Sequence, residues 1–366
     1  MPNRPRAREL GINIGRATPG THNAITDVPG VRVGHVTLIE GEGPLRIGEG
    51  PVRTGVTAIL PPGDNWYDHP VEAGHFIFNG SGTVAGLSLI DEFGRIETPV
   101  LLTNSLSVGT VYEGIVRFMV KHIFGPRGRV PWFNPVVGET SDASMNDIGG
   151  LHVRPEHAVE AIEKATGWPV AEGNVGGGTG MRALGYKAGI GTASRVMEID
   201  GEESTLGVLV QSNFGGRLTI KGVDIGQELA REGVESESEG NSIMIIVATD
   251  FPLSNRLLNR LAKRATIGMA RAGSSGGHGS GDYVIAFSTT QRTPGAMPVS
   301  RKAIAEDEGR INGLFERVAE ATEEAIINSL FKAETVTDPR GETWEAVPVD
   351  LVAEILRSKG LIDPST

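Results

Sequence analysis

Cysteine is absent from this chain and aromatic residues are few. None of the 366 residues is Cys, and Phe, Trp and Tyr together make up 5%. The absence of thiols excludes a disulfide scaffold, a thiolate zinc site, an iron–sulfur cluster and a cysteine nucleophile. Hydrophobic residues still account for 39% of the chain. That content is enough for a sizeable core, in one large α/β unit or in two domains of roughly 100–200 residues.

Positive charge and long apolar runs are also scarce. The chain has 34 Lys and Arg against 45 Asp and Glu, so its net charge is 34 − 45 = −11. This acidic balance disfavours nucleic acid and anionic membrane surfaces as partners. No segment approaches the ~18 consecutive apolar residues of a membrane span. The basic N-terminus is not followed by the apolar region of a signal peptide, so we expect a cytoplasmic protein.

Glycine, in contrast, is abundant. The chain has 51 Gly among 366 residues, about twice the average share of ~7%. The glycines do not recur every third residue, so they predict a compact fold with many tight turns. Residues 173–191 are the richest in glycine, but they lack the Gly-Lys-Ser/Thr ending of a phosphate loop. We therefore expect turns that line a cleft there, and no nucleotide site.

Histidine and serine motifs point to no common catalytic centre. The eight histidines form no HExxH, and Pro155 separates His152 from His157, so they do not share a helical face. No Gly-x-Ser-x-Gly elbow leads from an expected strand into an expected helix, so a conventional Ser-His-Asp triad has no obvious position. We expect neither a metal nor a cofactor.

Apolar periodicity predicts a mixed succession of strands and helices. The strands are expected within residues 24–37, 55–60, 99–102, 204–211, 242–250 and 283–288. The helices are expected around residues 111–122, 156–165, 254–269, 311–331 and 349–357, the third with Ser254 as N-cap and Ile267 on its apolar face. Residues 124–155 are rich in Gly, Pro, Asn and Asp and are expected to be loop. This pattern favours a layered α/β sandwich.

Ser242 stands at an informative boundary. The polar, acidic residues 231–241 are expected to form an exposed, mobile segment, and they run directly into the apolar residues 242–250. Such a run is typical of a strand buried on both faces. If the Asn241–Ser242 peptide is cut, Ser242 gains an α-amine with a pKa of about 7.7–8.0, which can serve as its general base. A serine that merely opens a strand is the alternative, and spacing alone leaves both open.

Several segments together resemble one enzyme family. Residues 239–253 are similar to the self-processing serine peptidases of the DmpA/BapA type, the L-aminopeptidase/D-amidase-esterases and β-peptidyl aminopeptidases. Further matching segments are residues 4–11, 24–36, 101–109 and 280–282. The similarity covers essentially the whole chain, in order.

The resemblance implies a fold, an assembly and an activity. The expected fold is a four-layer αββα sandwich, like that of N-terminal-nucleophile hydrolases but with different connectivity. Residues 1–366 would form a single domain that cuts itself into an α-chain, 1–241, and a β-chain, 242–366. The αβ units would assemble into a homotetramer. Short peptides, amides or esters are the expected substrates.

The resemblance also assigns roles to individual residues. Ser242 would be the nucleophile that forms an acyl-enzyme, and Asn241 would be the residue before the cut. Asn213 would donate its side-chain amide to the oxyanion. Ser280 and Asp282 would orient the α-amine of Ser242, and Asp282 would also hold a substrate ammonium. Whether that amine or the Ser280–Asp282 pair acts as the base stays open.

One segment departs from the family pattern. Ahead of the Asn146–Asp147 pair the family usually has Gly followed by an aromatic residue, whereas this chain has Ala143 and Ser144. In some relatives that aromatic side chain contributes a hydroxyl to the oxyanion hole. Ser144 and Asn146 are therefore expected to contact substrate, with a changed preference.

Two other functions are left open by the sequence. A fold-related acyltransferase is one, although those enzymes use Thr as nucleophile and this chain has Ser242. The other is a binding protein that processes itself but turns nothing over, which the loss of the aromatic at Ser144 would suit.

Overall fold

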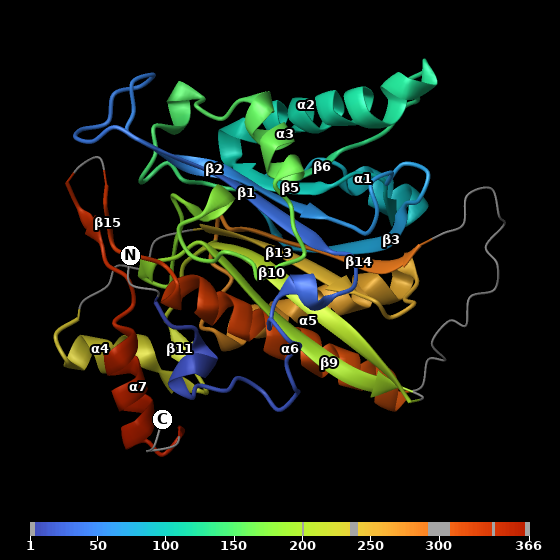
Figure 1. Cartoon of the computed structure of the whole chain (residues 1–366). Coiled ribbons are helices and arrows are strands. Elements are labelled where there is room, and N and C mark those ends of the chain that lie inside the picture. Colours follow the sequence, from blue (N-terminus) through green and yellow to red (C-terminus); the bar gives the residue numbers. More distant parts are fainter. Residues whose placement is uncertain (1–3, 200, 235–240, 292–307, 339–340, 363–366) are drawn as a thin grey trace.

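Four layers make up the structure, a computed structural model that describes residues 4–199, 201–234, 241–291, 308–338 and 341–362. Two β-sheets are stacked, and helices cover the outer face of each sheet (Figure 1). This arrangement confirms the predicted αββα sandwich.

The first sheet has four strands in the order β1-β2-β5-β6. Its strands are β1 (Arg32–Glu40), β2 (Val52–Leu60), β5 (Val100–Asn104) and β6 (Val136–Thr140). The second sheet has six strands in the order β4-β3-β14-β13-β10-β9. They are β3 (Val71–Gly80), β4 (Arg95–Ile96), β9 (Ile190–Ile199), β10 (Glu202–Phe214), β13 (Asn241–Thr249) and β14 (Gly281–Gln291). Only the pairs β5–β6 and β13–β14 are parallel within these sheets as described.

Helices α2 and α3 cover the first sheet, and α5 and α6 cover the second (Figure 1). The helices are α1 (Leu87–Phe93), α2 (Val108–Met119), α3 (Pro155–Glu163), α4 (Ile225–Arg231), α5 (Asn255–Arg271), α6 (Glu308–Phe331) and α7 (Val349–Ser358). Short two-residue strands are β7 (Arg182–Ala183), β8 (Tyr186–Lys187), β11 (Thr219–Ile220), β12 (Val223–Asp224), β15 (Val336–Thr337) and β16 (Thr343–Trp344). In the described part of the chain, no helix combines the length and hydropathy needed to cross a bilayer.

Strand β13 is buried on both faces, as its continuous apolar sequence predicts. Ile243 and Ile245 belong to the core formed with α5 and α6, whereas Met244 and Ile246 belong to the core between the two sheets. Successive side chains of a strand point to opposite faces. Ser242 is therefore in phase with Met244, on the face toward the first sheet.

Two strands of the structure were not predicted from the sequence, and one of them lies in a segment expected to be loop. Residues 124–155, expected to be loop, contain the buried strand β6, whose five residues are too few to show a clear pattern between Pro135 and Ser141. Strand β3 was not predicted because Gly74 interrupts its apolar pattern. A Cβ at Gly74 would lie 2.6 Å from the backbone nitrogen of Asn259, so the close approach of α5 requires glycine there.

The expectations for helix α5 were partly met. Ser254 occupies the N-cap position with extended backbone angles, but its side chain makes no capping hydrogen bond. Ile267, expected on the apolar face, is 45% exposed. The helix nevertheless buries the rest of that face, including Leu258 and Leu261, against the second sheet.

Candidate active site

Ser242 lies in the middle of the second sheet, at the start of β13. Its side chain is largely buried. Its register partner across the antiparallel pair with β10 is Asn213, and its partner across the parallel pair with β14 is Gly281. Directly opposed residues of an antiparallel pair carry side chains on one face, with Cβ atoms roughly 4.5–5.5 Å apart. The register thus brings together the predicted nucleophile and the predicted oxyanion donor.

The side-chain amide of Asn213 is fixed from both ends. Its Oδ1 accepts a hydrogen bond of 3.2 Å from the backbone N–H of Arg182, and its Nδ2 donates one of 2.9 Å to the carbonyl of Ser141. One partner donates and the other accepts, so the orientation of the amide follows from its contacts. Nδ2 carries a second hydrogen, which this arrangement leaves for an oxyanion beside Ser242.

Ser280 and Asp282 lie on either side of Gly281, the parallel partner of the nucleophile. The hydroxyl of Ser280 donates a hydrogen bond of 2.6 Å to Oδ1 of Asp282. The amide of Asn79 donates one of 2.7 Å to Oδ2 of the same carboxylate. Burial raises the pKa of Asp282, although both hydrogen bonds favour its charged form. The predicted Ser280–Asp282 pair is therefore assembled, and Asn79 is a third member that sequence reasoning missed.

A second buried carboxylate, Glu139, borders the same strand ends. It accepts a hydrogen bond of 2.8 Å from the backbone N–H of Thr83 and another from the hydroxyl of Ser105. A Cβ at Gly82 would lie 2.8 Å from Oε1 of Glu139 and 3.5 Å from Cα of Gly281. A side chain at residue 82 would therefore have to displace the carboxylate. In the sequence, the only hint of this carboxylate is that Glu139 directly follows the short apolar run of residues 136–138.

The segment that departs from the family pattern forms a tight loop after β6. Ser144 is half-buried in it, while Asn146 is buried. Oδ1 of Asn146 accepts from the backbone N–H of Arg53 at 3.0 Å, and its Nδ2 donates to Asp142 at 3.1 Å. Both ends of the Asn146 amide thus hold the loop in place. Burial raises the pKa of Asp142 to about 6.

The predicted cut lies between the first two residues of β13, Asn241 and Ser242. The segment expected to be exposed and mobile precedes it, and residues 235–240 of that segment lie outside the described residues. Residues 231–233, at the end of α4, are exposed as expected.

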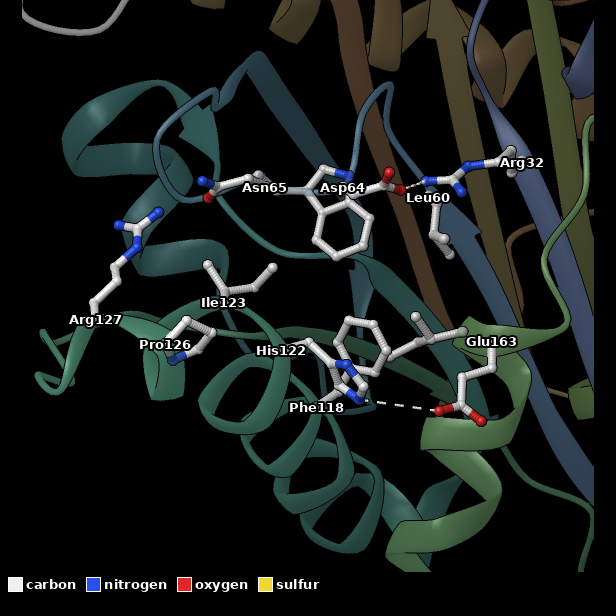
Figure 2. Close-up of a pocket in the computed structure, with 12 residues that line it drawn as sticks. Arg32, Leu60, Asp64, Asn65, Phe118, His122, Ile123, Pro126, Arg127 and Glu163 are labelled. Carbon is white, nitrogen blue, oxygen red and sulfur yellow. Dashed lines mark hydrogen bonds and ion pairs between the residues drawn. The ribbon is translucent and has the colours of Figure 1, made fainter.

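A separate cavity of about 540 Å³ lies at the ends of β1 and β2, beside α2 and α3 (Figure 2). Trp66 lines this cavity. Among its other lining residues, Arg32 pairs with Asp64 at 2.7 Å and His122 lies 4.0 Å from Glu163, whereas Arg127 pairs with Asp68, outside the lining. None of the catalytic candidates lines this cavity. Across the described ranges, no three His, Asp or Glu side chains are grouped as metal ligands.

Comparisons with known proteins agree with this geometry. The model of peptidase family S58 matches residues 23–344. The β-peptidyl aminopeptidase BapA of Sphingosinicella microcystinivorans is 45% identical over 372 residues, which cover 96% of this chain and 92% of that protein.

Two solved structures are also similar to this chain over nearly its whole length. A crystal structure of a protein from Pyrococcus horikoshii OT3 superposes with a TM-score of 0.90 at 47% identity, covering 97% of this chain and 99% of that one. The L-aminopeptidase D-Ala-esterase/amidase of Ochrobactrum anthropi is described as a prototype of the serine aminopeptidases. Its structure superposes with a TM-score of 0.89 at 38% identity, covering 98% of this chain and 100% of that one. The chain therefore belongs to peptidase family S58, and it is a peptide-bond hydrolase of the DmpA/BapA type.

Proposed function

We propose that this peptidase is an aminopeptidase that cuts its own chain before Ser242 and then uses Ser242 as an N-terminal nucleophile. The observation that carries the proposal is the register of β13, which sets Ser242 opposite Asn213 and beside Gly281. A nucleophile, an oxyanion donor and a buried acid–hydroxyl pair thereby meet at one end of one sheet.

The cut would use the same hydroxyl as the later reaction. Oγ of Ser242 attacks the carbonyl carbon of Asn241, and the amide nitrogen leaves as the α-amine, so the acyl group moves from nitrogen to oxygen. Water then hydrolyses the ester and releases the carboxylate of Asn241. The products are residues 1–241 and, since 366 − 241 = 125, a second chain of 125 residues.

In each turnover the freed α-amine would take the proton from Oγ as Oγ attacks the substrate carbonyl. Nδ2 of Asn213 stabilises the oxyanion, the substrate amine leaves with the proton, and water hydrolyses the acyl-enzyme. The Ser280–Asp282 pair, held by Asn79, would orient the α-amine.

The substrates would carry a free N-terminus. Glu139, in β6 of the first sheet, and Asp282, in β14 of the second, are buried carboxylates near the same site, and their negative charge favours a substrate ammonium over an internal peptide. We propose short peptides, amides and esters, with N-terminal β-residues tested first because the relative at 45% identity is named a β-peptidyl aminopeptidase. A cytoplasmic homotetramer of αβ units without a cofactor belongs to the same proposal and depends on the resemblance.

The test begins with the intact mass of freshly purified protein under denaturing conditions. Two species that sum to the full chain plus one water, split at Asn241–Ser242, are expected. The processed protein is then given α- and β-aminoacyl anilides, with N-acetylated anilides as controls. Release of the aniline from the substrates with a free amine, and not from the N-acetylated ones, supports the proposal. Processed protein without turnover would favour the binding-protein alternative that Ser144 suggests, and transfer of the acyl group to an added amine with no hydrolysis would favour an acyltransferase.

A further inference from the structure

Lys187, in β8, is a buried amine that the mechanism above does not use. It is fully buried, and its Nζ donates to the carbonyls of Met181 at 2.5 Å and Ala188 at 2.6 Å. Among the residues that the structure describes, no carboxylate lies within ion-pair distance of Nζ. Burial lowers the pKa of Lys187 to about 7. A buried amine without a counter-charge is costly, and perturbed groups of this kind gather at functional sites.

The carbonyl that binds Lys187 belongs to a peptide unit of the active site. The peptide between Met181 and Arg182 carries that carbonyl at one end and, at the other, the N–H that donates to Oδ1 of Asn213. The two groups of a trans peptide point in opposite directions in one plane. The backbone N–H of Ala188 donates to the same Met181 carbonyl at 3.1 Å. Lys187 and Asn213 are therefore joined through one rigid peptide.

We propose that Lys187 is a positioning residue for the oxyanion-binding amide of Asn213, and that it acts through the Met181–Arg182 peptide. This inference rests on the proposed function, in which Asn213 binds the oxyanion. Two effects combine in it. The first effect is structural: the two hydrogen bonds from Nζ fix the turn, so the peptide N–H holds the Asn213 amide in one orientation before the reaction begins.

The second effect is electronic. When Lys187 is protonated, its cation draws electron density from the peptide carbonyl and makes the N–H of that peptide a stronger donor to Oδ1 of Asn213. That bond in turn polarises the side-chain amide, so its Nδ2–H becomes a stronger donor to the oxyanion. Linked hydrogen bonds strengthen one another in this way in a low dielectric.

A double-mutant cycle separates this role from simple support of the turn. Lys187→Met removes the donor at similar volume, and Lys187→Gln keeps a neutral donor. Each is made alone and together with Asn213→Ala. Lys332→Met is the matched control, because Lys332 also donates from its ammonium to a backbone carbonyl, that of Arg4, away from Ser242. All rates are divided by the processed fraction measured by mass.

Lys187→Met is expected to lower kcat about tenfold and to leave KM within about twofold of the wild-type value. The kcat of Lys187→Gln should lie between those of the wild type and Lys187→Met. In the Asn213→Ala background the same change should cost no more than about twofold, because the amide it serves is gone. Lys332→Met should leave kcat unchanged. If Lys187→Met does not accumulate as folded protein, Lys187→Gln completes the same cycle.

An equal loss in both backgrounds, a change in KM alone, or no loss at all would overturn the role of Lys187. Failure of the proposed function looks different, because hydrolysis would then persist in Ser242→Ala. Activity that needs both Ser242 and Asn213 but ignores Lys187 would leave the proposed function standing and refute only this inference.

Discussion

Asn79 holds the carboxylate of Asp282 from the neighbouring strand, with Nδ2 donating 2.7 Å to Oδ2. The two residues are register partners between β3 and β14, immediately before an irregularity in that pairing. Strand irregularities next to active sites commonly re-aim a side chain. Here the irregularity lies between Asp282 and Tyr283 on β14 and between Ile77 and Asn79 on β3, directly beside the amide and the carboxylate that bind each other.

The first prediction concerns the acid limb of the pH profile. Burial raises the pKa of Asp282, so its carboxylate is lost on acidification above the usual value of about 3.9. Asn79→Ala removes a donor to the charged form and should raise this pKa further. The acid limb of kcat/KM should therefore move to higher pH in Asn79→Ala, and Asp282→Asn should lose most activity at every pH. Asp64→Asn, an exposed control, should change neither. An unmoved limb in Asn79→Ala would contradict this role.

The second prediction concerns self-cleavage. Ser242→Ala should leave one uncut chain without hydrolase activity, since no hydroxyl remains to attack Asn241. Denaturing mass spectrometry checks the chain, and anilide hydrolysis checks the activity. The matched control is Ser254→Ala, because the Ser254 side chain makes no capping hydrogen bond. Two fragments from Ser242→Ala would sink the mechanism.

A third prediction addresses the oxyanion hole. Asn213→Ala should lower kcat by about 10²–10³ with a small change in KM, because the lost donor acts mainly in the transition state. Steady-state kinetics of the processed fraction tests this. Asn13→Ala, at an exposed asparagine, should be unchanged. A loss confined to KM would mean that Asn213 binds substrate in the ground state instead.

The fourth prediction concerns stability. Glu324 and Arg195 are buried partners at 2.7 Å, linking α6 to β9. Glu324→Gln leaves the Arg195 charge without its full partner and should destabilise the fold by about 3–5 kcal/mol. Urea unfolding at neutral pH measures this. Glu113→Gln, in an exposed pair with Arg117, is the control and should have no measurable effect.

The pH dependence of the same pair has a definite sign. Burial opposes the charged form of Glu324, but Arg195 and the hydrogen bond from Arg8 outweigh it, so the pKa is lowered from 4.5. The stability this group provides is present above the unfolded pKa and is lost as the pH falls through the folded one. The difference between wild type and Glu324→Gln should therefore shrink in acid. A constant difference would contradict the assignment.

The sequence predicted those parts of the fold whose patterns are local. The apolar run of β13 and its polar approach identified Ser242, and helical spacing identified α5 and α6. Strand β3 escaped because Gly74 accommodates a helix more than 180 residues away in the chain, which no local pattern records. Asn79, near the end of β3, was not predicted as a site residue either, because its partner Asp282 lies on the distant strand β14.

Other site residues depended on contacts between distant segments. Glu139 ends a strand too short to recognise, and its neighbour Gly82 comes from the turn after β3. Lys187 lies in a glycine-rich segment between Tyr186 and Ala188, and only the folded turn reveals that it and Asn213 hydrogen-bond to the same peptide. Register and turn geometry therefore supplied what periodicity could not.

The strand order of the second sheet has a consequence for the fate of a severed chain. Residues 242–249 of β13 and the whole of β14 follow the predicted cut, and they lie between β3 and β10, which precede it. A break before Ser242 would leave two polypeptides interlocked along both flanks, so neither could dissociate without dismantling the central sheet. After denaturation the two pieces would have to find each other at low concentration, and unfolding of the mature protein should show hysteresis that the uncut chain lacks.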